Sequence, residues 1–242
     1  MDVSGLWLAG DRCSYCSGFN ENMRLAERYV RFNIPELMRV AANAVHREEC
    51  VRIEKMAEGG FNKIFLLSMN DGYQVIARIP TSIAGPPHFT TASEVATLDL
   101  LNFLGIPVPK VFAHCSHRGE DNSVEAEYII MERLHGESLA ERWDTLSEAD
   151  LADVMKQVAT IESELMKLSL PAYGSLFYQD DVEAHGQVAF QKTASNPNHL
   201  LGRMCIGPVA NSAFWHGERQ SLNIDRGPCA FCGWQIHYTH VD

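Results

Sequence analysis

The sequence predicts an α+β fold, with a five-stranded antiparallel sheet and one packed helix followed by an incomplete helical lobe. Two observations support this prediction. Between residues 51 and 132, runs of β-branched and large apolar residues alternate with tight-turn residues, as in short antiparallel strands. Between residues 147 and 168, apolar residues recur at helical spacing. A chain of 242 residues, 46% of them apolar and 21% charged, is long enough for one large domain or two small lobes.

Composition and charge exclude several function classes. The formal net charge of −11 at pH 7 disfavours general binding to nucleic acids or anionic membranes, because the averaged field repels phosphate groups. A locally basic pocket remains compatible with this charge. No stretch approaches about 18 consecutive apolar residues, so no membrane span is expected.

Seven cysteines and an N-terminus without a secretory signal indicate reduced thiols in an intracellular compartment. Two C-x-x-C pairs, CSYC (13–16) and CAFC (229–232), stand near the chain ends, with His237 and His240 beside the second. Two such pairs can form one tetrahedral zinc site, but they are usually much closer together in the sequence. Their separation favours free thiols, and no metal site is predicted.

A helix opens the organised region. Residues 35–44 place apolar side chains at helical spacing, Asn33 can cap the helix start, and Pro35 fits its first turn. Residues 51–80 then predict three successive strands that are separated by two glycine-containing turns.

The first of these turns, EGGFN (58–62), has two interpretations. Adjacent glycines let a backbone approach a ligand closely, and successive amide groups there can cradle phosphates. Alternatively, Gly59 and Gly60 only supply positive φ angles in a hairpin. The third strand carries Arg78 between apolar neighbours. This cation either contacts nucleotide phosphates or is an ordinary surface charge.

A second helix is predicted over residues 90–104, with Gly105 at its end. Glu94 has two interpretations. It either faces the sheet and pairs with Arg78, or it closes a capping box with Thr91 at the helix start. The core-facing residues of this helix are expected to be Val95, Leu98, Leu101 and Leu104.

Two further strands are predicted, at residues 106–115 and 126–136. Two prolines make the first an edge or entry segment, because proline cannot donate to a central ladder. A short helix at 138–143 and a long one at 147–170 follow. The long helix is expected to present one buried apolar stripe, made of Leu151, Val154, Val158, Ile161, Leu165 and Leu168.

Several long strings in these elements carry a resemblance to a known family. They are RYVRFNIPELMRVAANAV, EGGFNKIFLL, DGYQVIARIPTSIAGPPHFTTASEVATLDLLNFLGIPVPKVFAH, AEYIIMERLHGESLAERW and FWHGERQSLNIDRGP. Through them the run from Arg28 to about Pro228 resembles the aminoglycoside-phosphotransferase-like branch of the protein-kinase-like fold. Within that branch it is similar to a group of fungal proteins named for altered inheritance of mitochondria.

The resemblance implies an ATP site with three parts: a glycine-rich loop over the phosphates, a phosphate-contacting cation with its carboxylate partner, and a hinge that binds adenine. In that order the residues are Gly59, Gly60 and Asn62; Arg78 and Glu94; and Met131, Glu132, Arg133 and Leu134. Arg78 stands where the family usually has a lysine. The planar guanidinium of arginine contacts a phosphate with a different geometry from that of a lysine ammonium group.

The resemblance also predicts the domain organisation. Residues 1–28 form an irregular N-terminal segment, and residues 29–134 form a kinase-like N-lobe with a leading helix. Residues 135–228 form a partial helical C-lobe with a substrate-side insertion, and residues 229–242 form a divergent tail.

The stretch HGERQSLN (216–223) has the spacing of a kinase catalytic loop, H-x-D-x-x-x-x-N, with Glu in place of Asp. Its candidate catalytic residues are His216, Glu218 and Asn223. In kinases a second, metal-binding acid follows after a strand pair, whereas Asp225 comes only two residues after Asn223. We therefore interpret this stretch as a family block upstream of the true catalytic loop.

The expected function is that of a C-terminally truncated phosphotransferase family protein with a possible ATP cleft. Without a catalytic loop and a magnesium-binding motif it would be inactive in phosphoryl transfer; ATP and magnesium are the cofactors that the resemblance implies. One alternative is an active small-molecule kinase that uses the HGERQSLN loop. Another is a mitochondrial pseudokinase-like interaction protein.

Two further expectations concern partners and location. Without further helices to cover it, the apolar face of the long helix would be exposed to a protein partner. The resemblance implies a mitochondrial location, while an N-terminus unlike a transit peptide leaves the cytoplasm as the alternative.

Overall fold

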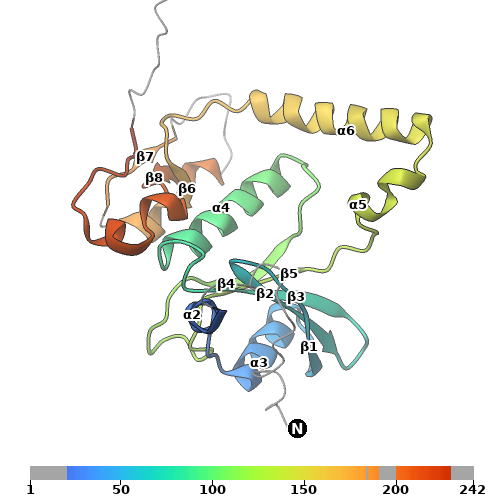
Figure 1. Cartoon of the computed structure of the whole chain (residues 1–242), viewed down its shortest axis with the longest axis horizontal. Helices are drawn as coiled ribbons and strands as arrows, with labels where there is room; N and C mark the ends of the chain where they lie inside the picture. Colours follow the sequence, from blue (N-terminus) through green and yellow to red (C-terminus); the bar gives the residue numbers. More distant parts are fainter. Residues whose placement is uncertain (1–20, 184, 191–199, 230–242) are drawn as a thin grey trace, which may run out of the picture.

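The computed structural model describes residues 21–183, 185–190 and 200–229 (Figure 1). Its helices are α2 (Glu21–Glu27), α3 (Ile34–Ala44), α4 (Phe89–Phe103), α5 (Leu139–Arg142) and α6 (Glu148–Met166). Its strands are β1 (Cys50–Glu58), β2 (Asn62–Met69), β3 (Gln74–Pro80), β4 (Val111–Cys115), β5 (Tyr128–Glu132), β6 (Ser175–Tyr178), β7 (Val188–Ala189) and β8 (Met204–Gly207). Helix α2 and the last three strands were not predicted from the sequence.

Strands β1 to β5 form one antiparallel sheet in the order β1-β2-β3-β5-β4. The hairpin between β2 and β3 turns at Gly72, whose φ of 85° is a left-handed conformation that favours glycine. Strand β4, which follows the two prolines, lies at an edge of the sheet as predicted. The predicted α+β fold with a five-stranded antiparallel sheet is confirmed.

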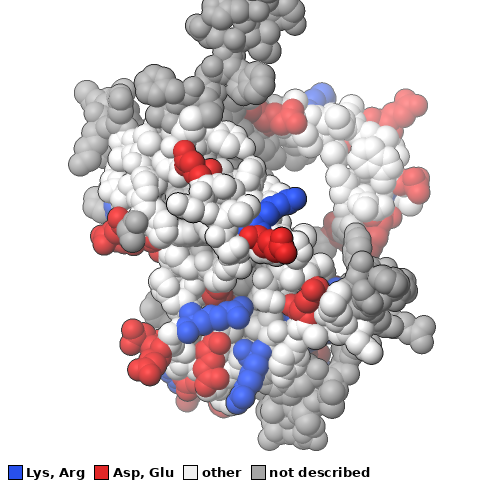
Figure 2. Space-filling model, turned by 60° about the vertical axis from the view of Figure 1, so that its left-hand side comes forward, with Lys and Arg blue, Asp and Glu red and all other residues white. Residues whose placement is uncertain are grey.

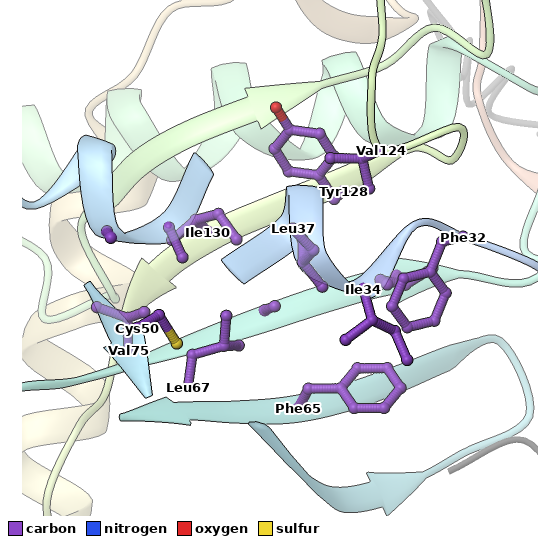
Figure 3. Packing of buried hydrophobic residues seen from close by; sticks show 14 of the residues in the cluster. Phe32, Ile34, Leu37, Cys50, Phe65, Leu67, Val75, Val124, Tyr128 and Ile130 are labelled. Carbon is purple, nitrogen blue, oxygen red and sulfur yellow. The ribbon is translucent and has the colours of Figure 1, made fainter. Parts of the chain in front are cut away.

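Helix α3 covers one face of this sheet (Figure 3). Its first turn is capped by Asn33, whose side chain accepts a hydrogen bond from the Glu36 amide at 3.3 Å. Its apolar side packs on alternate residues of β2, β3 and β5, because side chains at every second strand position share one face. The buried side chains there include Leu37 and Ala41 of α3 with Phe65, Leu67, Val75, Ala77, Tyr128 and Ile130.

Helix α4 lies between the five-stranded sheet and a second, smaller sheet (Figure 1). The smaller sheet has the strand order β6-β8-β7 and is antiparallel throughout. On one side of α4, Val95 packs against Ile129 of β5. On another side, Ala96 and Leu100 pack against Met204 of β8. One helix therefore contributes to two apolar cores.

The predicted core-facing residues of α4 are partly wrong. Val95 is fully buried, but Leu98 and Leu101 are only half-buried. The residues that complete the buried surface are instead Phe89, Thr91, Ala92, Ala96 and Leu100. The physical reason is that α4 is covered from two sides, so its buried residues do not follow the single stripe of a helix with one covered face.

Helix α6 begins with a capping box in which Ser147 and Asp150 exchange hydrogen bonds. Irregular segments join it to α5 and to β6, and Figure 1 shows it standing apart from the sheets. None of its residues is buried by the described part of the chain. The predicted buried stripe therefore has the expected spacing, but the prediction of its burial is wrong.

The surface of the five-stranded sheet carries interleaved acidic and basic side chains (Figure 2). Half-buried Glu58 pairs with Lys55 at 2.6 Å, with Lys63 at 2.9 Å and with Arg28 at 3.7 Å. No helix in the described ranges has both the length and the apolar character needed to cross a membrane. The cysteines of CSYC, Cys232, His237 and His240 lie outside the described residues.

Candidate nucleotide site

Arg78 lies on β3, on the sheet face opposite α3. Its neighbours Ala77 and Ile79 point into the α3 core, so alternation places Arg78 on the other face, toward α4. There its guanidinium forms an ion pair with the carboxylate of Glu94 from α4. The two side chains are 28% and 22% exposed, which leaves both within reach of a ligand. Burial lowers the pKa of Arg78, but guanidinium groups stay protonated in proteins.

The structure decides between the two interpretations of Glu94. Helix α4 begins at Phe89, two residues before Thr91, so Thr91 is not at the helix start. The Thr91 hydroxyl donates instead to the buried carboxylate of Glu127, at 2.6 Å. The capping box is therefore wrong, and the alternative ion pair with Arg78 is present.

The glycine turn between β1 and β2 is open on its outer side. Neither Gly59 nor Gly60 has a positive φ, so the interpretation of a turn that needs such angles is wrong. An added Cβ on either residue would meet no described atom within 4 Å. Neither the backbone conformation nor the packing within the described residues therefore requires glycine at these two positions. Close approach of a ligand to the backbone is a remaining reason for glycine there.

The amide groups of this turn are only partly available to a ligand. The Gly59 amide donates to the Asn62 carbonyl at 3.0 Å, so it is already used. The Phe61 carbonyl accepts hydrogen bonds from the Thr81 amide at 2.8 Å and from its hydroxyl at 3.1 Å. These contacts hold the turn against the end of β3. Among the predicted loop residues, Gly60 keeps an amide that points to no described acceptor.

The predicted hinge follows β5. Met131 is buried on the α4 side of the sheet. The Glu132 amide donates to the Lys110 carbonyl at 2.8 Å, so this amide is not free for adenine. Leu134 is 57% exposed, and its amide makes no hydrogen bond within the part of the chain that the structure describes. The Arg133 amide also makes no hydrogen bond within the described residues, so the amides of Arg133 and Leu134 are the available donors of the predicted hinge.

Strand register brings these three parts to one face of the sheet. Arg78 lies opposite Ile64 of β2, and Asn62, two residues before Ile64, ends the glycine turn. On its other side Arg78 lies opposite Ile129 of β5, two residues before Met131. The glycine turn, the Arg78–Glu94 pair and the hinge therefore border one apolar surface, in the order that the resemblance implies.

The other predicted candidates lie in an exposed loop. His216, Glu218 and Asn223 are all exposed, and no described contact joins them to Arg78 or Glu94. The loop is organised by Arg226, which stacks over the Trp215 ring at 4.1 Å. Its guanidinium also donates to the carbonyls of Phe214, Arg219 and Leu222, at 3.3, 2.5 and 3.2 Å. The contacts of this loop thus centre on the half-buried guanidinium of Arg226 rather than on its acids.

The described residues do not fit a magnesium ion well. Magnesium prefers carboxylate oxygens beside the phosphates, and Glu94, the acid near Arg78, is engaged by the guanidinium. Elsewhere in residues 21–183, 185–190 and 200–229, no three His, Cys, Asp or Glu side chains come together as metal ligands.

The hydrogen bonds that position α4 were not predicted from the sequence. The Tyr178 hydroxyl of β6 donates to Asp99 of α4 at 2.6 Å; burial and this carboxylate raise the pKa of Tyr178, so the hydroxyl keeps its proton. At the start of α4, the His88 ring forms two hydrogen bonds. Its Nδ1 lies 2.8 Å from the Ser116 hydroxyl oxygen, and its Nε2 lies 2.7 Å from the Asp181 carbonyl oxygen. These partners are far apart in the sequence, and no local motif signals them.

The fold agrees with a sequence match to a family model. Residues 53–193, more than half of the chain, match the model described as the phosphotransferase enzyme family, APH. The chain belongs to this family. The matched region contains the glycine turn, Arg78, Glu94 and the predicted hinge.

Three relatives illustrate the likeness. A subtelomeric hrmA-associated cluster protein of Aspergillus fumigatus is 47% identical over 76% of this chain and 34% of its own length. Proteins named altered inheritance of mitochondria protein 9, mitochondrial, are 32% identical in Zygosaccharomyces rouxii and 28% identical in Debaryomyces hansenii. These matches cover 76% and 75% of this chain, and 32% and 30% of the relatives. The chain thus spans about a third of the length of the curated relatives it matches.

Among solved structures, the GDP and kanamycin complex of APH(2")-IIia is similar, with a TM-score of 0.35 and 16% identity. The match covers 57% of this chain and 46% of that chain.

Proposed function

We propose that this phosphotransferase family chain binds a nucleoside triphosphate such as ATP on the α4 side of its five-stranded sheet. The phosphates would lie under the glycine turn beside Arg78, and the base would lie near Leu134. The observation that carries the proposal is the Arg78–Glu94 ion pair, which joins a strand and a helix at the border of an apolar surface.

The chemistry of this pair suits an anionic ligand. A guanidinium has five N–H donors, so Arg78 can bond Glu94 and still offer donors to phosphate oxygens. The carboxylate of Glu94 fixes the direction in which those donors point. A charge in this half-buried position costs desolvation energy, which the ion pair offsets and a bound phosphate would offset further.

We propose further that the described residues alone do not transfer the phosphoryl group. Transfer needs groups that orient the nucleophile and neutralise the developing charge. His216, Glu218 and Asn223, the candidates for this role, are exposed on a loop that Arg226 organises for its own packing. The proposed role of the chain is therefore nucleotide binding.

The test is an ATP titration followed by thermal shift, with and without magnesium. ATP is expected to raise the melting temperature of the wild type, and Arg78→Ala is expected to weaken binding about tenfold or more, because it removes the phosphate contact. Arg52→Ala is the matched control, since Arg52 also lies on a strand of this sheet but is exposed and paired with Glu54. Circular dichroism checks the fold of both variants.

Two results would contradict the proposal. The first is a melting temperature that does not respond to ATP in the wild type. The second is an equal loss of binding in the Arg78 and Arg52 variants. A response that needs magnesium and disappears in Glu218→Ala would instead support the alternative of an active kinase with a HGERQSLN site.

A second proposed function is protein binding through α6. It is favoured by one observation: α6 carries regularly spaced apolar side chains, and none of its residues is buried by the described part of the chain. This function does not depend on nucleotide binding at Arg78.

We also propose a mitochondrial location. The support is the name of the altered inheritance of mitochondria relatives, at 28–32% identity. Fractionation of cells that express the chain with a small C-terminal tag tests it. Recovery in the mitochondrial fraction with protection from added protease is expected, whereas recovery in the cytosolic fraction would contradict it.

A further inference from the structure

One face of β3 carries a polar residue at each end and an apolar residue between them. The residues of β3 that point into the α3 core alternate with Gln74, Ile76 and Arg78, which therefore share the opposite face. All three are half-buried. Gln74 and Arg78 are four positions apart on an extended strand, about 13 Å along it. The sheet face on which we place the nucleotide thus has a polar group at each end.

Hydrogen bonds join Gln74 to both neighbouring strands. Ser68 of β2 lies opposite Gln74, and the Gln74 Nε2 donates to the Ser68 hydroxyl oxygen at 3.0 Å. On the other side Val75 pairs with Glu132, so the next position of the same register places Arg133 opposite Gln74. The Arg133 guanidinium donates to the Gln74 Oε1. Gln74 thus uses both ends of its amide to connect β2 with the residue that follows β5.

The contact between Arg133 and Gln74 is the last hydrogen bond that ties the hinge to the sheet. Strand β5 ends at Glu132, its last residue that pairs with β3. Residues 134–137 make no hydrogen bond to the sheet within the part of the chain that the structure describes. The available amides of Arg133 and Leu134 lie at this point of the chain. Their positions therefore depend on the Arg133 side chain and on its acceptor, Gln74.

The middle of this sheet face suits the base of a nucleotide. Ile76 lies opposite Leu66 of β2 and Met131 of β5, and this apolar row separates Gln74 from Arg78. Small-molecule sites are lined mainly by apolar side chains, with a few polar groups that fix the orientation of the ligand. A base on this row would have Arg78 at its phosphate end and Gln74 at its hinge end. Gln74 is therefore placed to affect the base rather than the phosphates.

We infer that Gln74 is a positioning residue for the base of the proposed nucleotide. It holds the Arg133 guanidinium and thereby sets the position of the Arg133 and Leu134 amides that would bond the base. Hydrogen bonds weaken steeply as their angle departs from linearity, so a small shift of these amides weakens the base contact. The inference rests on the proposed nucleotide binding at Arg78, to which it adds a residue that controls how much the base contributes.

The experiment compares ATP with inorganic tripolyphosphate, which has the phosphates but no base, by titration calorimetry on the full chain without magnesium. Gln74→Leu keeps the approximate size of the side chain and removes both of its hydrogen bonds. It is expected to weaken ATP binding about fivefold and to change tripolyphosphate binding by less than about twofold. Arg78→Ala is expected to weaken binding of both ligands, because it removes the phosphate contact.

Gln74→Glu is the matched conservative variant. A carboxylate can accept hydrogen bonds from both the Arg133 guanidinium and the Ser68 hydroxyl, so the connection is kept although the amide is lost. ATP binding by Gln74→Glu is expected to stay within about twofold of the wild type. A purely structural role of Gln74 would instead lower the melting temperature of Gln74→Leu without nucleotide and weaken binding of both ligands together.

A second variant tests whether Gln74 acts through Arg133. Arg133→Met removes the same contact from the other side and keeps an unbranched apolar side chain. If Gln74 acts through Arg133, the double variant is expected to bind ATP about as weakly as each single variant, because only one contact is lost. Independent effects would instead multiply, to a weakening of about 25-fold.

The outcomes separate the role of Gln74 from the function on which it rests. A wild type that binds neither ATP nor tripolyphosphate contradicts nucleotide binding itself, and the role of Gln74 with it. A wild type that binds both ligands, with ATP binding unchanged in Gln74→Leu, overturns the role of Gln74 alone. Equal weakening of both ligands in Gln74→Leu, or effects of Gln74→Leu and Arg133→Met that multiply, would also overturn it.

Discussion

At the scale of single residues, Arg78 and Glu94 show what local sequence reasoning can and cannot decide. The cation between apolar strand neighbours and the carboxylate on the next helix could both be found from the sequence. Whether they meet depended on where α4 begins. The helix starts at Phe89, and Thr91 is taken by Glu127, which lies 36 positions further along the chain. Nothing in the sequence around Thr91 indicates that Glu127 is its hydrogen-bond partner.

Glu58 provides a pH-dependent prediction at this scale. Burial by itself raises the pKa of this carboxyl, but hydrogen bonds and charges from Lys55 and Lys63 outweigh burial and hold the pKa below its ordinary value of 4.5. A lowered pKa in the folded state means that the ion pairs stabilise the protein above the unfolded pKa. That stability is lost as the pH falls from about 4.5 through the folded pKa.

Glu58→Gln is therefore expected to lower the free energy of unfolding by about 1 kcal/mol at pH 7 and by much less at about pH 3. Urea unfolding at the two pH values measures the difference. Glu54→Gln is the control, since Glu54 is exposed and pairs with Arg52 on the same strand. An equal loss of stability for Glu58→Gln at both pH values would contradict the ion-pair explanation.

At the scale of elements, the first five strands were predictable and the last three were not. Strands β1 to β3 are neighbours in the sequence and are joined by turns with a clear glycine signal. Strands β6, β7 and β8 are four, two and four residues long, too short to show a period of two. The pairing of β6 with β8 also joins segments separated by a long stretch of chain.

Helix α4 gives the prediction for this scale. Ala96 is fully buried between α4 and β8, where its small side chain allows close packing. Ala96→Leu is expected to reduce the free energy of unfolding by about 1–3 kcal/mol, because added methylene groups force the core apart. Denaturant unfolding measures this change.

Ala152→Leu makes the same change on α6, where the side chain is exposed, and is expected to change stability by less than about 0.5 kcal/mol. If the two substitutions have equal effects, α4 does not hold the small sheet as the structure shows. This comparison tests the second core directly.

At the scale of the whole molecule, two sheets share one helix, and α6 stands outside both cores. The two sheets should therefore unfold together, because loss of either removes burial from α4. In hydrogen exchange, amides of β2, β3, α4 and β8 are expected to share the slowest rates. Amides of α6 are expected to exchange much faster, since no tertiary burial protects them.

A clear separation between the exchange rates of β3 and β8 would contradict this shared stability.

The family of the chain follows from the region 53–193, which spans most of the first sheet, α4 and α6. The sequence strings predicted that family, and most of them lie within the matched region. They do not reveal the hydrogen bonds that Asp99 and His88 make to hold α4, since the partners of these residues are brought close only by the fold.

The shared helix also has a consequence for synthesis of the protein. Translation proceeds from the N-terminus, so α4 leaves the ribosome before β6, β7 and β8 exist. At a rate of about 5–20 residues per second, the delay until β8 is complete is on the order of 5–20 seconds. During that time the β8-facing side of α4, with Ala96 and Leu100, has no partner. The nascent chain thus presents to the cell an apolar surface of the kind that chaperones bind.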